Sequence, residues 1–211
     1  GIKSVSDKLS DFGGKAAMAG AALTAGLTLP LAGVAKGAID VASQFEATMG
    51  QGVGLAGASR EQVQAWQDDL VNLSKETGKS LNELAQGLYF VASSGIDASQ
   101  AMDVMTAAAK ASASGLGQTA VLADALTSAI NAYGAKNLSA AKATDILIAA
   151  VKVGKVEASQ LAPVLGRLLP TASALGIGFE QVAGALAVMS RTGLDAAEAS
   201  TSLSAIMSTL L

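Results

Sequence analysis

Hydrophobic side chains recur at every third or fourth position over most of residues 59–211, the spacing of helices with one apolar face. In the stretch 80–94, for example, Leu84, Leu88 and Val91 share one face. Hydrophobic and polar residues nowhere alternate over the length of a strand. The pattern therefore predicts an all-α fold. The expected helices lie near 59–76, 80–94, 97–113, 119–133, 139–153, 158–175, 179–191 and 195–211.

Several of these segments begin with the signature of a helix start. In a capping box, a Ser or Asp side chain accepts a hydrogen bond from a backbone N–H near the start of the helix, and a Glu or Gln three residues later accepts one in return. Residues of these types stand at the required spacing before four of the expected helices. The pairs are Ser59 and Gln62, Ser80 and Glu83, Asp97 and Gln100, and Asp195 and Glu198.

A helix–glycine–helix unit recurs along the chain. Similar segments of the first helices are headed by Leu84, Leu122 and Leu161, at spacings of 38 and 39 residues. Each first helix is followed by a glycine, where a left-handed residue closes a helix at little cost, and then by a second helix. A fixed spacing of this kind predicts stacked helical hairpins in three quasi-repeats. The glycines are Gly95, Gly134 and Gly176.

Two features disturb this regularity towards the end of the chain. Pro163 and Pro170 fall inside the first helix of the third unit, so we expect that helix to be kinked or split. The last expected helix, 195–211, continues to the final residue with no stop signal. The sequence therefore reads as a piece of a longer protein that is truncated at its C-terminus.

The first 58 residues have a different character. Residues 16–35 carry no charge and lie between Lys15 and Lys36, and Ala, Gly and Thr dominate them. Twenty such residues are just long enough to cross a bilayer, but their weak hydropathy favours an apolar helix that packs against other copies of the chain. The expected organisation is an N-terminal helical arm over 1–49, a Gly-rich hinge over 50–58 and a helical-hairpin domain over 59–211.

Two short motifs imitate nucleotide-binding loops. Gly52, Gly54 and Gly57 match the spacing of the dinucleotide fingerprint, and the run Thr77-Gly78-Lys79-Ser80 imitates the end of a phosphate-binding loop. Both loops work only where a strand precedes the glycines and a helix N-terminus follows. A helix is expected before each of them here, so hinge and turn are the favoured interpretations, and we predict no cofactor-binding residues.

Composition narrows the chemistry further. The chain has no cysteine and no histidine, and its net charge is −3. Thiol chemistry, disulfides and imidazole metal ligands are excluded, and no basic patch indicates specific nucleic-acid binding. No pair of carboxylates stands in an evident cleft as a glycosidase would need. We therefore predict no catalytic residues and no metal site. Aromatic residues make up only 3% of the chain, so its core should be thin.

Several runs carry a resemblance to one family. The segments are LSKETGKSLNELAQGLYFVASSGIDASQAM, PLAGVAKGAIDVASQFEATM, Leu122-Ala123-Asp124 through Tyr133-Gly134, Ala174 through Ile177, and Arg191 through Leu194. Together they resemble the conserved N-terminal region of tailed-phage tail tape measure proteins. Near the end the family often has Gly-Thr-x-Leu-Arg, whereas this chain has Ser200, Thr201, Leu203 and then Ser204.

The resemblance implies a structural, non-enzymatic segment of a protein that lies in the tail-tube lumen, helps to set tail length and leaves ahead of the DNA. It implies several copies, contacts with tail-tube, tail-tip and baseplate-hub proteins and with a tail assembly chaperone, and contact with the host inner membrane on infection. Long coiled-coil regions are expected elsewhere in such proteins. Two alternatives remain at this stage. One is a membrane-active, pore-forming protein built around a transmembrane helix at 16–35, and the other is a peptidoglycan hydrolase.

Overall fold

The computed structural model describes residues 47–48 and 58–210. The expected arm over 1–49, with its apolar segment 16–35, and the expected hinge over 50–58 lie almost entirely outside these residues. From residue 58 to residue 210 the chain folds into helices without any strand. They are α3 (Arg60–Thr77), α4 (Leu81–Ser93), α5 (Ala98–Ala113), α6 (Thr119–Tyr133), α7 (Ala140–Val153), α8 (Ala158–Ala174), α9 (Phe179–Arg191) and α10 (Ala196–Ser208).

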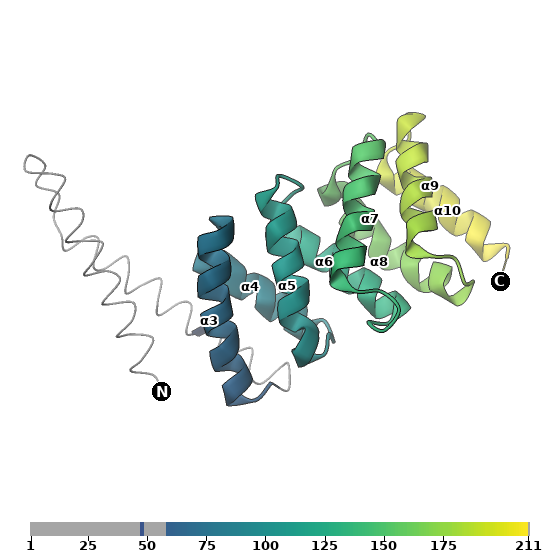
Figure 1. The fold of residues 1–211 in the computed structure, drawn as a ribbon. Coiled ribbons are helices and arrows are strands. Elements are labelled where there is room, and N and C mark those ends of the chain that lie inside the picture. Colours follow the sequence, from purple (N-terminus) through teal and green to yellow (C-terminus); the bar gives the residue numbers. More distant parts are fainter. Residues whose placement is uncertain (1–46, 49–57, 211) are drawn as a thin grey trace, which may run out of the picture.

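The helices form two layers that stack along one direction (Figure 1). Helices α3, α5, α7 and α9 pack side by side in the first layer, and α4, α6, α8 and α10 do so in the second. Consecutive helices also pack against each other, except for α7 and α8, so the two layers are joined along the stack. This arrangement is that of a helical solenoid, in which each repeat contacts only its neighbours. The predictions of an all-α fold and of stacked hairpins are confirmed.

One hydrophobic core runs through the whole stack between the layers. Its largest fully buried side chains include Leu88, Leu126 and Leu165, each of which lies at the same place in its second-layer helix. Many other core positions are alanine, for example Ala123 and Ala129, both fully buried. Alanine lets neighbouring helices approach closely but buries little area per residue. Aliphatic side chains therefore supply most of the apolar burial, as the low aromatic content predicts.

The structure contains two of the four capping boxes that the sequence predicts. Capping boxes form at Ser59 with Gln62 and at Asp195 with Glu198. The other two predicted boxes do not form. Ser80 accepts from the backbone N–H of Glu83, but the Glu83 carboxylate bonds elsewhere. Asp97 accepts from the N–H and the hydroxyl of Ser99, so Gln100 takes no part in a box.

The sequence predicts that α8 is kinked or split at its prolines, and the structure shows that it is not split. Helix α8 is a single element that contains both Pro163 and Pro170. Both rings are exposed, seven positions apart on one side of the helix, while Leu165, Leu168 and Leu169 on the other sides are fully buried. A proline inside a helix removes one backbone hydrogen bond. The freed carbonyls lie on the side of α8 that faces water, where solvent can satisfy them, and packing of the opposite side holds the helix together.

The glycines between paired helices have positive φ angles, as the sequence predicts, although Gly134 has a ψ angle of 137° and so lies outside the left-handed helical region. Gly95, Gly134 and Gly176 have φ angles of 82°, 80° and 72°. A Cβ atom added at Gly95 would meet no atom within 4 Å. Backbone geometry, and not space, therefore explains why glycine stands at this position.

Replacing Gly95 with valine is expected to lower the free energy of unfolding by about 1–2 kcal/mol, because a β-branched residue is strained in the left-handed region. Asparagine at the same position should cost less, since it enters that region more readily. Urea denaturation of the two variants checks this difference. Equal losses for both would mean that the glycine serves packing after all.

Gly154, at the end of α7, has a different role. Its φ angle is −83°, which any residue can adopt. A Cβ atom there would lie 2.9 Å from Ser190 Oγ and 3.0 Å from the Cα of Ala187, both in α9. We expect Gly154→Ala to destabilise the fold by about 1–3 kcal/mol through overpacking.

The matched control for that substitution is Gly184, an exposed glycine inside α9 with open space around its missing side chain. Gly184→Ala should stabilise the fold by about 0.5–1 kcal/mol, because alanine is the better helix former. The two variants can be compared by their thermal unfolding midpoints. A gain in stability for Gly154→Ala would contradict the proposed close approach of α7 to α9.

Candidate functional site

One edge of the stack carries an open polar groove between the start of α4 and the loop that joins α5 to α6. Lys79, Glu83, Gln86, Gln118 and Thr119 line it. The Thr119 hydroxyl donates a hydrogen bond to Glu83 Oε1, and Lys79 Nζ lies 3.7 Å from the same oxygen. The Gln118 side chain does not cap α6, so the Glu83 carboxylate supplies the negative charge that a helix N-terminus favours. The hydrogen bond between Thr119 and Glu83 therefore places the groove where α4 meets α6 of the next repeat.

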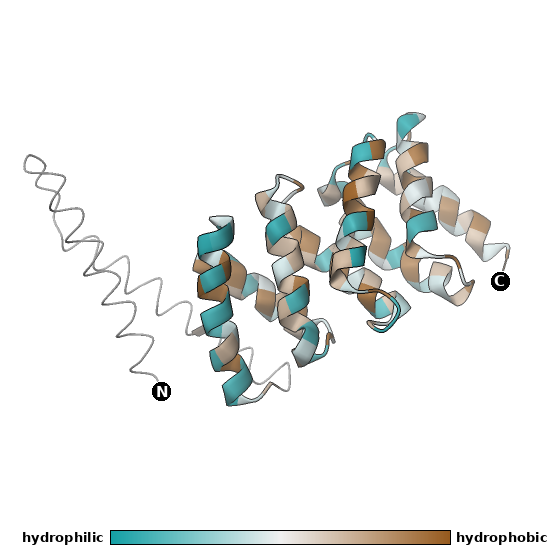
Figure 2. Ribbon diagram, in the orientation of Figure 1, coloured by the Kyte–Doolittle hydropathy of each residue, from teal (hydrophilic) through white to brown (hydrophobic). Residues whose placement is uncertain are grey.

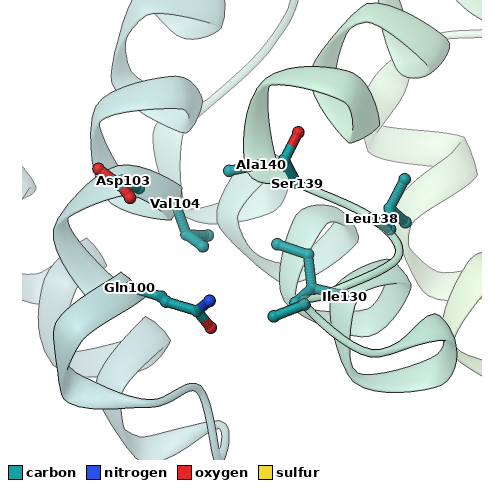
Figure 3. Close-up of a pocket in the computed structure, with 8 residues that line it drawn as sticks. Gln100, Asp103, Val104, Ile130, Leu138, Ser139 and Ala140 are labelled. Atoms are coloured by element: carbon teal, nitrogen blue, oxygen red, sulfur yellow. The ribbon is translucent and has the colours of Figure 1, made fainter.

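A smaller cleft lies at the opposite edge, where α5 begins and α6 is joined to α7 (Figure 3). Its volume is about 80 Å³. The Gln100 amide and the Asp103 carboxylate stand on the α5 side, while Val104 and Ile130 form its apolar floor. Pockets for cofactors or drug-sized ligands occupy about 300–1,000 Å³. This cleft is therefore suited to one side chain of a partner rather than to a nucleotide.

The run that imitates a phosphate-binding loop has other structural duties. Gly78 ends α3 in a left-handed conformation, and its N–H donates to the Ser74 carbonyl. Ser80 caps α4, and Lys79 pairs with Glu83. The segment before the loop is a helix and not a strand, so the context that phosphate binding requires is missing. The Gly52, Gly54 and Gly57 motif lies outside the described residues.

Perturbed titratable groups are scattered over the stack. Partial burial raises the pKa of the Asp124 carboxyl on α6 and, with the nearby Glu180 charge, that of the Tyr133 phenol. The hydrogen bond from Lys142 lowers the pKa of Glu180, and bonds from Ser99 lower that of Asp97. Each shift has a local structural cause: Asp124 and Tyr133 lie nine positions apart on α6, Glu180 lies on α9 and Asp97 caps α5. Within the described residues no group of three or more Asp or Glu could hold a metal ion.

Polar contacts between successive repeats were not apparent from the sequence. Asn131 in α6 donates to the Ser94 carbonyl at the end of α4, and Ser173 in α8 donates to the Ala132 carbonyl. Tyr133 donates to the Ile177 carbonyl. These bonds join residues 37 to 44 positions apart. The repeat length is the signal in the sequence that could have indicated them, because it brings equivalent helix ends into register.

Ion pairs follow the same pattern in the first layer. Lys110 in α5 pairs with Glu76 in α3 at 2.9 Å, and Lys142 in α7 pairs with Glu180 in α9 at 2.8 Å. All four side chains are more than half exposed, so each pair adds at most about 1 kcal/mol. These ion pairs help to fix the register in which neighbouring first-layer helices pack, but they add little to the free energy of unfolding.

Comparison with known proteins gives a consistent result. Residues 67–211 match the family model of phage-related minor tail proteins. The tape measure protein of Pneumococcus phage Dp-1 is 29% identical over 189 residues, which cover 90% of this chain and 16% of that protein. A probable tape measure protein of Clostridium phage phiCD119 is 29% identical over 171 residues, which cover 79% of this chain and 18% of that protein. The chain thus spans less than a fifth of either relative, and no solved structure matches it.

Proposed function

This chain belongs to the phage-related minor tail protein family and has a structural role in a phage tail, and on that premise we propose that it is a docking segment of a tape measure protein. In this proposal the whole protein lies in the lumen of the tail tube, helps to set tail length and leaves ahead of the DNA at infection. The described segment contributes no catalysis. It folds as a unit that other tail components recognise, while the length-setting part of the protein lies elsewhere.

The observation that carries this proposal is the folded-back architecture. A continuous helix adds about 1.5 Å per residue along its axis and so can act as a ruler. Among the described helices the longest, α3, has 18 residues, and successive helices alternate between the two layers. The apolar side of every described helix needs a neighbouring helix to cover it. Such a stack has a length fixed by its repeats and a rigid surface, which favours docking.

Removing one repeat tests the proposal. Deleting residues 119–157 removes α6 and α7. Helix α8 can then take the place of α6, because both helices carry leucine three and seven positions after their first residue. In a phage that carries this deletion, tail assembly should fail or tails should keep their normal length in electron micrographs. Tails shortened by about 1.5 Å for each deleted residue would show that this segment is itself the ruler. A deletion of equal length in a coiled-coil region of the full protein is the control.

Partners follow from the same proposal. The expected partners are other copies of the chain, tail-tube and tail-tip or hub proteins, a tail assembly chaperone and the host inner membrane. In the described part of the chain, no helix combines the length and the apolar character that crossing a bilayer requires. In the proposal, contact with the membrane involves the apolar segment 16–35. We propose that this segment, in an arm over 1–49 joined by the hinge 50–58, bundles several copies together.

Liposome flotation separates this role from the membrane-active alternative. If the arm serves self-association, the purified chain should form oligomers and stay in the dense fraction, and deletion of residues 16–35 should yield monomers. Flotation of the intact chain that is lost on the same deletion would support a pore-forming protein instead. A zymogram on peptidoglycan tests the hydrolase alternative, and a cleared band would overturn the non-enzymatic proposal.

A further inference from the structure

Two successive joints of the stack can be compared position by position, because α7 and α9 begin in the same way. In each helix the residue before the N-cap is hydrophobic, Leu138 before α7 and Ile177 before α9. The first residue after the cap is Ala140 in α7 and Phe179 in α9. The two joints therefore share one plan but differ in one side chain, which is a methyl group at the first joint and a phenyl ring at the second.

The second joint buries its phenyl ring. Phe179 is 1% exposed, and its ring stacks on Tyr133 at the end of α6. At the first joint Ala140 lines the cleft of about 80 Å³ that lies between α5, α6 and α7 (Figure 3). The chain thus has an open cleft beside the small residue and a buried ring at the equivalent place in the next repeat.

The inner surface of the cleft suits an aromatic ring. Val104, Ile130 and Leu138 line it and are at most 4% exposed, and the side chains of Val104 and Ile130 face each other in Figure 3. One water molecule needs about 10–15 Å³ of such a volume. The cleft therefore has room for about six non-hydrogen atoms, which is the number in a phenyl ring.

The rim of the cleft carries a carboxylate that lacks a cation. Asp103 is exposed and belongs to none of the ion pairs of the described residues, and no lysine or arginine is among the described residues that line the cleft. The third and sixth residues of α5 are Gln100 and Asp103, and those of α7 are Lys142 and Asp145. Lys142 pairs with Glu180 of α9 at 2.8 Å. The first joint thus has a neutral amide where the second has an ammonium group.

We propose that the cleft is a docking site for a segment of a partner protein that inserts one aromatic side chain and places a basic side chain beside Asp103. The partner supplies from outside the two groups that Phe179 and Lys142 supply within the chain at the next joint. A ring in a desolvated pocket is a typical anchor of protein interfaces. The ion pair orients the segment and adds little affinity, since Asp103 is exposed. The proposal rests on the comparison of the repeats and does not depend on the tail function.

An NMR titration of the full chain with the acetylated and amidated tetrapeptide Gly-Phe-Lys-Gly tests this site. We expect saturable shifts of the Gln100 side-chain amide and of the Ile130 and Leu138 methyl groups. Alanine in place of the peptide's phenylalanine should abolish them. Glutamine in place of its lysine should weaken binding by about two- to fivefold, the size of an exposed ion pair. Asp103→Asn should remove this difference between the peptides, whereas Asp69→Asn, an equal charge change on exposed α3 surface, should leave it intact.

A second variant tests the comparison of the joints directly. Ala140→Phe should place a ring in the cleft, raise the thermal unfolding midpoint and weaken binding of the tetrapeptide by about tenfold or more. The matched control is Ala141→Phe, which adds the same ring at the next position, where the side chain is exposed and does not line the cleft. The control should bind the tetrapeptide as the unchanged chain does.

Several outcomes would overturn the proposal. The alanine peptide could bind as tightly as the phenylalanine peptide, a peptide with glutamate in place of lysine could bind more tightly, or the shifts could spread over the surface without saturating. Tighter peptide binding after Phe12 and Phe45 are replaced by alanine would assign the cleft to the N-terminal part of this chain. A dimer in light scattering that Ala140→Phe converts to monomer would identify a second copy as the occupant.

Discussion

Replacing Phe179 with alanine is expected to lower the free energy of unfolding by about 3–5 kcal/mol, the usual cost of deleting a buried aromatic ring. Phe179 is the first residue of α9 and is 1% exposed. Its ring stacks on Tyr133 of α6, with centroids 6.3 Å apart. The substitution would leave a cavity where the second and third hairpins meet, in a core that holds few other aromatic residues. Guanidinium unfolding followed by circular dichroism measures the loss.

The control for this prediction is Tyr133→Phe, which keeps the ring pair and removes one hydroxyl. That hydroxyl donates to the Ile177 carbonyl at 2.8 Å, and its loss should cost about 0.5–1.5 kcal/mol. A loss for Phe179→Ala no larger than that for the control would mean that the joint collapses around the missing ring. The ring pair would then contribute little to the stack.

Leu168→Ala is expected to lower the free energy of unfolding by about 2–5 kcal/mol, because Leu168 is fully buried in α8, a helix that packs against α6 and α10, and its truncation leaves a cavity. The matched control is Ile206→Ala at the equivalent position of α10, where the side chain is 56% exposed. We expect the control to change stability by less than about 1 kcal/mol. Equal losses at the two positions, measured by urea denaturation, would show that Ile206 is covered in the isolated chain.

Local patterns were sufficient for most of the secondary structure. The predicted and observed starts of the eight helices differ by at most one residue, and their ends differ by at most three. Helix starts depend on side chains within a few residues, such as Ser59 with Gln62. The glycines after α4, α6 and α8 depend on backbone sterics alone. The repeat length of 38 and 39 residues then predicted hairpins, because equal units expose equal faces.

The functional interpretation depended on the sequence and on the tertiary structure. The resemblance of quoted segments to tape measure proteins indicated the family, and the match over residues 67–211 established it. No candidate site residue could be predicted, because the groove and the cleft each combine residues from segments about 30 or more positions apart. Surfaces of this kind exist only once the repeats are stacked.

What the sequence alone determined is therefore the set of helices, their turns and the hairpins. Helix starts and turns follow from interactions within a few residues, and the hairpins follow from the repeat length. Only the tertiary structure decided where the Glu83 carboxylate goes, because Thr119 of the next repeat competes with the N-cap of its own helix. It also decided that α8 stays whole across Pro163 and Pro170, because burial of the opposite face outweighs two lost backbone bonds. The exposure of Ile206 is likewise a property of the stack, since the residue at the same position is buried in α4, α6 and α8.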